Sequence, residues 1–220
     1  MKNAIAKLPT DTWIVATWEE YIEAIASPAY EQARGYYHDG RMRIEMAPIG
    51  YDHSCDHTII LFAVNLFCSI KGIPITGLTG CSFRKPGLKE CQPDVAYYIG
   101  ESAQVVPRGT KIVSLDSYPP PDLAIEVGDT TLSDELGNKR ILYEELSVAE
   151  YWVVDVQKAQ LKAFAVADGG SRRISESQVL PGLAMSFLEE ALRRSREANQ
   201  AQVGAWLLQT FQSSDYTLDN

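Results

Sequence analysis

Three short segments in the middle of the chain are apolar almost throughout. They cover residues 93–99, 122–127 and 150–156. Continuous apolar runs of this length are typical of strands that are buried on both faces of a sheet. We therefore expect these segments to form central strands of the fold.

Two hairpins are predicted beside these strands. In residues 35–46, apolar and polar positions alternate around Asp39-Gly40, a dipeptide that favours a tight turn. The 150–156 strand leads through a short polar link into another apolar run at 161–166, which indicates a second antiparallel pair. The sheet should therefore contain antiparallel as well as parallel strands.

The first two predicted helices have clear starts and stops. Thr17 can cap a helix that reaches Ile25, because Glu20 stands at the capping-box position. A longer and strongly apolar helix is expected at 54–71, with Asp52 or Ser54 as its cap and Gly72 after its end. Its apolar residues surround the helix, which predicts a central position.

A third helix, at 134–146, separates the 122–127 and 150–156 strands, with Thr131 and Asp134 at capping-box spacing. Strand, helix and strand in this order predict a right-handed crossover. A last helix is expected at 188–208. We expect its apolar residues to dock on the core or on a second subunit, which would make a homodimer; they are Val203, Trp206 and Leu207, followed by Phe211.

Length and composition indicate a globular α/β protein. The 220 residues are 45% hydrophobic and 22% charged, without repeats or low-complexity segments. We expect an N-terminal segment (1–16), one domain (17–187) and a C-terminal helix and tail (188–220). The longest apolar stretch, Ile59–Phe67, is too short to span a bilayer, and no signal peptide is visible, so we expect a cytoplasmic protein without a membrane partner.

Cysteine spacing and charge narrow the function classes. The four cysteines are 13, 13 and 10 residues apart and form no Cys-x-x-Cys pair, so we interpret them as buried small hydrophobes; they are Cys55, Cys68, Cys81 and Cys91. A net charge of −9 argues against binding nucleic acid by non-specific attraction. It does not exclude a nuclease, because carboxylates that hold a divalent cation are neutralised when the ion binds.

Two acids in the apolar strands are candidate metal ligands. A charge in a buried strand is costly unless it is paired or holds a metal, and Glu126 lies between Ile125 and Val127. Asp122 is four residues away on the same strand, roughly 13 Å at 3.3 Å per residue, which is too far to share an ion. Asp94, at the start of another strand, is the better partner.

Lys139 is the third candidate. It lies on the helix that follows the strand of Glu126, where an ammonium could stabilise negative charge on a phosphate. The alternative is a surface ion pair with Glu135, four residues earlier on the same helix.

These residues stand in a pattern that resembles the Uma-two family of restriction-endonuclease-like proteins, within the PD-(D/E)XK nuclease superfamily. The resemblance covers about residues 17–190. The matching segments are Gly40–Met46 with Pro48 and His53, Gln92–Val95, Pro121–Val127, Asp134 with Lys139 and Tyr143, Val148–Asp155 and Leu180–Leu183.

The resemblance implies a restriction-endonuclease-like αβββαβ core, in which a central mixed sheet is flanked by helices. It also implies that Asp94 and Glu126 hold Mg²⁺ or Mn²⁺. The superfamily's usual lysine position, two residues after the acid, is Gly128 here, and Lys139 replaces it on the next helix. The stretch around Tyr36 lacks the acid that the family commonly has, and Glu45 is a candidate for the missing carboxylate.

Other candidate residues carry weaker signals. His53 and His57 are one helical turn apart, a spacing that can hold zinc, but no third ligand is evident. We expect His53 to cap its helix or face a substrate and His57 to be structural. The aromatic residues Tyr143, Tyr151 and Trp152 are predicted to pack the helix against the sheet.

Three functions remain open at this point. The first is a metal-dependent nuclease that hydrolyses phosphodiester bonds of nucleic acid, with DNA as the expected substrate. The second is a nuclease-fold module that binds nucleic acid or protein without catalysis. The third is a metal hydrolase of small phosphoesters, because a fold does not fix its substrate.

Overall fold

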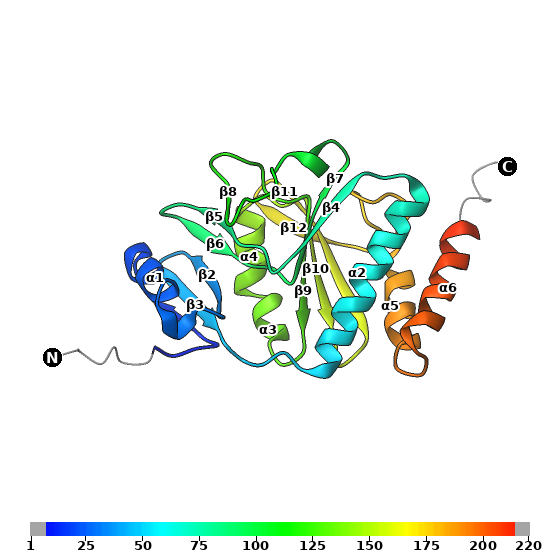
Figure 1. The fold of residues 1–220 in the computed structure, drawn as a ribbon, viewed down its shortest axis with the longest axis horizontal. Coiled ribbons are helices and arrows are strands. Elements are labelled where there is room, and N and C mark those ends of the chain that lie inside the picture. The colour runs from blue at the N-terminus through cyan, green and yellow to red at the C-terminus, as the bar shows by residue number, and fades with distance from the viewer. Residues whose placement is uncertain (1–7, 214–220) are drawn as a thin grey trace.

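A six-stranded mixed sheet, sheet B, forms the centre of the molecule in the order β12-β11-β10-β9-β7-β4 (Figure 1). The structure is a computed structural model that describes residues 8–213. The strands of sheet B are β4 (Ile75–Thr79), β7 (Val95–Ile99), β9 (Leu123–Gly128), β10 (Glu150–Asp155), β11 (Gln160–Ala167) and β12 (Gly170–Ile174). Strands β9 and β10 are parallel, and the other pairs are antiparallel.

The central position of the three apolar segments is confirmed. Every residue of β9 and β10 is buried, and so are the first four residues of β7. Strand β10 also forms the expected hairpin with β11. Continuous apolar sequence therefore reports burial on both faces, because helices cover both sides of this sheet.

The helices lie in two layers around sheet B. On one face, α2 (Tyr51–Lys71), α5 (Met185–Arg194) and α6 (Gln200–Ser213) share a core cluster with residues of the sheet. On the other face, α3 (Leu132–Glu135) and α4 (Asn138–Glu145) pack against β9 and β10. The expected mixed sheet flanked by helices is confirmed (Figure 1).

A second six-stranded sheet, sheet A, was not predicted; its order is β1-β3-β2-β6-β5-β8. Its strands are β1 (Trp13–Val15), β2 (Arg34–His38), β3 (Arg41–Glu45), β5 (Phe83–Lys85), β6 (Lys89–Cys91) and β8 (Val113–Ser114). The β2–β3 hairpin turns at Asp39 (φ 48°) and Gly40 (φ 67°), as predicted. Helix α1 (Trp18–Ile25) has the expected Thr17–Glu20 capping box. Two 3₁₀ helices complete the fold, η1 (Pro28–Tyr30) and η2 (Gly100–Gln104).

Three helix predictions were wrong in detail. Helix α2 begins at Tyr51 and its N-cap is Gly50, so neither Asp52 nor Ser54 caps it. The predicted helix at 134–146 is broken into α3 and α4, because Gly137 (ψ −105°) leaves the helical conformation. Thr131 also makes no side-chain cap.

The predicted helix at 188–208 is likewise two helices. Helix α5 ends at Arg194, and Arg196 leaves the helix to bind the buried carboxylate of Asp56 and the carbonyl of Val156. After this turn, α6 packs its buried residues Val203, Leu207 and Phe211 into the core cluster. The structure therefore places the C-terminal helix on the core of the same chain.

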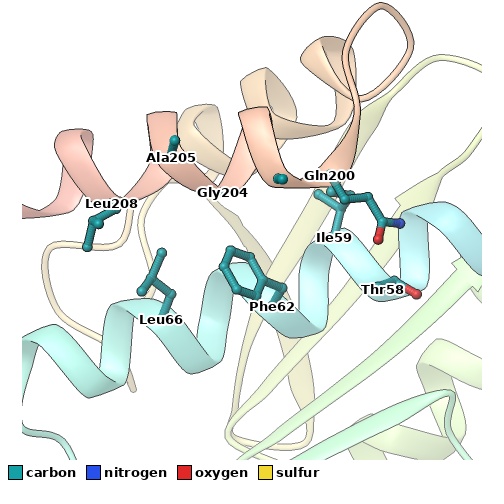
Figure 2. A pocket seen from close by; sticks show the side chains of 9 residues that line it. Thr58, Ile59, Phe62, Leu66, Gln200, Gly204, Ala205 and Leu208 are labelled. Carbon is teal, nitrogen blue, oxygen red and sulfur yellow. The ribbon is translucent and has the colours of Figure 1, made fainter.

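Helices α2 and α6 border a cavity of about 450 Å³. Figure 2 shows Phe62 and Leu66 of α2 facing Gly204 and Leu208 of α6. Gly204 permits the close approach, because a Cβ there would lie 3.1 Å from Phe62 Cε1. Among residues 8–213, α2 has the length and apolar composition of a membrane span. Its buried residues lie in the core cluster, which accounts for much of its apolar character.

Candidate functional site

Asp94 directly precedes β7, and Glu126 lies on β9, the strand that pairs with β7 in antiparallel. The register pairs Val95 with Ile125, so the next step along both strands brings Asp94 opposite Glu126. Both carboxylates are buried, with 3% and 1% exposure. They share the sheet face of Ala96 and Ala124, which is the face covered by α4. The expected carboxylate separation of about 4–6 Å stays a prediction.

The carboxylate of Asp94 is held by several donors. Its Oδ2 accepts a hydrogen bond from the Val127 N–H at 2.7 Å, and its Oδ1 accepts one from the Arg34 guanidinium. His53 Nε2 lies 3.5 Å from Oδ2. Burial raises the pKa of Asp94, but the contacts with His53, Arg34 and Val127 together hold it well below its ordinary value. Asp94 is therefore ionised at neutral pH.

The carboxylate of Glu126 has a different environment. The Tyr143 hydroxyl donates to Oε1 at 2.7 Å. The Tyr36 hydroxyl donates to the Gln92 carbonyl at 2.7 Å and lies 3.2 Å from the same Glu126 oxygen. Lys139 Nζ lies 3.5 Å from Oε2. Burial raises the pKa of Glu126 to about 8, although Lys139 lowers it, and the neighbouring acids raise it further. Tyr143 thus holds Oε1 of Glu126, with Tyr36 beside it, and Oε2 faces Lys139.

Lys139 is buried at the centre of the site, with 1% exposure. Its Nζ lies 3.0 Å from Glu45 Oε1, 3.5 Å from Glu126 Oε2 and 3.6 Å from Glu135 Oε1. It also lies 4.1 Å from the centre of the Tyr36 ring. Burial lowers the pKa of Lys139, but the surrounding carboxylates raise it more, so the ammonium stays charged. The alternative of a surface ion pair with Glu135 is wrong, because Glu135 is buried too; Lys139 contacts both Glu126 and Glu135.

Gly128 makes room for Glu135 at the position of the superfamily's usual lysine. A Cβ on Gly128 would lie 3.1 Å from Glu135 Oε2 and 3.3 Å from the Cα of Leu132. A longer side chain would extend into the space of the Glu135 carboxylate. The lysine of this chain therefore reaches the site from α4 and not from β9.

Gly128→Ala tests this packing. The variant should lose about 1–3 kcal/mol of unfolding free energy, since an overpacked core must shift its neighbours. Urea unfolding measures the change. Gly170→Ala is the matched control, because no atom lies within 4 Å of its added Cβ. Equal stability of the two variants would contradict the close packing at Gly128.

These side chains line a cavity of about 290 Å³ between the two sheets and α2, α3 and α4. Its lining contains six acids, Asp11, Glu45, Asp94, Glu126, Asp129 and Glu135, and three strong bases, Arg34, Arg43 and Lys139. A surplus of carboxylate oxygens is the chemistry that binds hard divalent cations.

The residues present fit a magnesium ion better than a cation that needs many protein ligands. Within residues 8–213, no group of three or more His, Cys, Asp or Glu is arranged to hold a metal ion. Mg²⁺ usually takes one or two carboxylates and keeps several water molecules. Asp94 and Glu126 match this smaller requirement.

His53 and His57 belong to α2, on the side of the helix near Asp94. His53 lines the cavity, and its Nδ1 is buried without a hydrogen-bond partner. His57 is also partly buried, and burial lowers its pKa. The ring centres are 6.4 Å apart. His53 thus faces the cavity, which was one of its two expected positions.

Several residues of the site were not identified from sequence. Arg34 and Tyr36 come from sheet A, which was not predicted to reach the strand acids. Tyr143 was assigned to the core, where it is buried, but its hydroxyl also binds Glu126. Glu135 was assigned to the surface. The available signal was spacing: Glu135, Lys139 and Tyr143 follow one another at four-residue intervals, which places them on one side of a helix.

Comparisons with known proteins agree with this picture. The family model Uma2, described as "Putative restriction endonuclease", matches residues 18–201. Among solved structures, the chain resembles one titled as a putative nuclease belonging to DUF820 from Anabaena variabilis ATCC 29413, with a TM-score of 0.57. The two chains are 15% identical, and the match covers 80% of this chain and 98% of the other. The comparison with curated proteins gives no match.

Proposed function

The chain belongs to the Uma2 family of restriction-endonuclease-like proteins, and from this premise we propose that it is a Mg²⁺- or Mn²⁺-dependent endonuclease that hydrolyses phosphodiester bonds of DNA. One observation carries the proposal. Two buried strand acids and a buried lysine line a single acidic cavity. Burial of three charged groups is costly, and such groups are common where chemistry requires them.

Asp94 and Glu126 would hold the divalent cation. When bound, the ion would supply a Lewis acid that activates water and offsets the charge of the phosphate. The protein prepares these ligands in two ways. Arg34 and the Val127 N–H keep Asp94 ionised and oriented, and the Tyr143 hydroxyl orients Glu126.

Lys139 would stabilise charge on the reacting phosphate. Its shortest contact, 3.0 Å to Glu45, fixes the ammonium in the cavity. The contact with Glu126 is longer, at 3.5 Å, so this side of the ammonium can turn toward a phosphate oxygen. A donor placed where negative charge develops accelerates the reaction without reorganising at the moment of bond breaking.

A substrate panel tests the function. Purified protein is incubated with supercoiled plasmid, single-stranded DNA, RNA and bis(p-nitrophenyl) phosphate, with Mg²⁺, Mn²⁺ or Ca²⁺, and with a chelator. We expect DNA cleavage with Mg²⁺ and Mn²⁺ and none with the chelator or with Ca²⁺, whose looser coordination activates water poorly. Cleavage should weaken with added salt, because phosphate contacts release counterions.

Other outcomes identify the alternatives. Turnover of the small ester without cleavage of any polynucleotide would identify a phosphoesterase. Retention of DNA or RNA without cleavage under all metals would identify a binding module.

A further inference from the structure

Glu135 is a buried acid with one oxygen that the protein leaves unpaired. The residue is 2% exposed, and it lines the same cavity as Asp94 and Glu126. Its Oε1 lies 3.6 Å from Lys139 Nζ. Its Oε2 is buried and has no hydrogen bond of normal geometry within residues 8–213, although the Thr131 side chain and the backbone N–H of Glu135 lie close enough to the carboxylate to lower its pKa. A buried acceptor without a donor is costly, so this arrangement calls for an outside donor.

The other acids nearest to Lys139 and the strand pair are already engaged. Both oxygens of Asp94 accept hydrogen bonds. Glu126 has two phenols on Oε1 and Lys139 facing Oε2. Glu45 binds Arg43 Nε at 2.7 Å and Lys139 at 3.0 Å through Oε1. Among these four acids, and within residues 8–213, Glu135 has the one carboxylate oxygen that is fully buried without a hydrogen bond.

The backbone beneath this oxygen is adapted to it. Oε2 stands 3.1 Å from where the Cβ of residue 128 would be, and that residue is glycine. Any larger residue would press on the carboxylate. The Glu135 carboxylate occupies the space beside residue 128, and Lys139 follows four residues later, across the break at Gly137.

We propose that Glu135 is the catalytic base of the site and takes a proton from the attacking water. This role rests on the proposed function. Water in the cavity would donate a hydrogen bond to Oε2. As the water oxygen bonds to phosphorus, its proton passes to Glu135 and the bond from phosphorus to the ester oxygen breaks. The leaving oxygen takes a proton from solvent, and Glu135 later returns its proton to solvent.

Two further features suit this role. Burial raises the pKa of Glu135, although Lys139 lowers it, and a more basic carboxylate accepts a proton more readily. Lys139 Nζ, 3.6 Å from Glu135 Oε1, is placed to stabilise the phosphate while Glu135 acts on the water. Glu135 would then act on the nucleophile and Lys139 on the group that it attacks.

The test combines a conservative variant with chemical rescue. Glu135→Gln keeps the side-chain volume and removes the proton acceptor, so Mg²⁺-dependent DNA cleavage should fall by about 10²–10⁴-fold, the usual contribution of a positioned base. Mn²⁺ binding, measured by calorimetry on the same sample, should persist. In Glu135→Ala, added formate or acetate should restore part of the rate, and acetate should be the more effective because it is the stronger base.

Glu45→Ala is the comparison variant. Glu45 is the closer partner of Lys139, so a role in holding the lysine predicts at least as large a loss there as in Glu135→Ala. Rescue that grows with the basicity of the added carboxylate should be seen in Glu135→Ala alone. Equal rescue of both variants would make Glu135 a structural partner of Lys139.

Failure of the two proposals can be told apart. If wild type cleaves DNA and Glu135→Gln cleaves it at the same rate, the role of Glu135 is excluded and the nuclease function stands. If Glu135→Gln loses Mn²⁺ binding together with activity, Glu135 acts on the metal site and not as a base. If wild type hydrolyses no phosphodiester, the proposed function fails and this role fails with it.

Discussion

Replacing Lys139 with methionine should reduce DNA cleavage by about 10²–10³-fold, the cost of removing one donor that stabilises a transition state. Methionine keeps much of the volume and removes the ammonium that faces Glu45, Glu126 and Glu135. Metal binding should be retained, because the proposed ligands Asp94 and Glu126 are unchanged. Cleavage rates at saturating Mg²⁺ measure the effect.

The same variant should also lose stability. Removing one partner of a buried ion pair leaves the other charge uncompensated and costs about 3–5 kcal/mol. Lys158→Met is the control, since Lys158 lies on the surface. Lys139→Arg separates the two effects, because it keeps the charge but changes the shape of the donor. Full activity of a folded Lys139→Met protein would remove Lys139 from the site.

Glu126→Gln and Asp94→Asn should each abolish detectable binding of Mn²⁺ and, with it, cleavage. Each substitution removes one of the two carboxylates that we propose as ligands. A cation held by a single protein carboxylate would bind much more weakly. Calorimetric titration with Mn²⁺ measures the binding. Glu101→Gln, on the surface, should bind as wild type does. Unchanged binding in either site variant would contradict the assignment of that ligand.

The difference in stability between Glu126→Gln and wild type should change with pH in a defined direction. The pKa of Glu126 is raised from 4.5 to about 8 in the fold, so the folded state binds more protons than the unfolded state between these values. Its contribution to stability is complete below about pH 4.5 and is lost as pH rises through about 8. Without metal, the variant should therefore gain stability relative to wild type as pH rises across this range, which thermal unfolding can follow.

The sequence was most informative where burial dictates residue type. Strands β7, β9 and β10 are largely apolar because both faces are covered, and this made Glu126 within β9 and Asp94 before β7 conspicuous. The Asp39-Gly40 turn was equally clear, because few residues accept positive φ. These local rules are enough to select Asp94 and Glu126 as a pair on neighbouring segments of the sheet.

The remaining parts of the site depend on contacts that are distant in sequence. Arg34 is 60 residues from Asp94, and Tyr36 is 90 residues from Glu126. The pattern of apolar and polar residues within one segment cannot indicate contacts between residues so far apart in sequence. Glu135 was misplaced for a related reason: an acid four residues before a lysine is a common surface pattern, and only the packing of α3 against β9 shows that both residues are buried.

The rate of plasmid nicking as a function of Mg²⁺ concentration, measured side by side for wild type and Glu126→Gln, tests the central claim most directly. We expect a rate that rises and saturates with Mg²⁺ in wild type, returns to zero with a chelator, and stays at background in the variant at every concentration. The same background nicking in both proteins would contradict it.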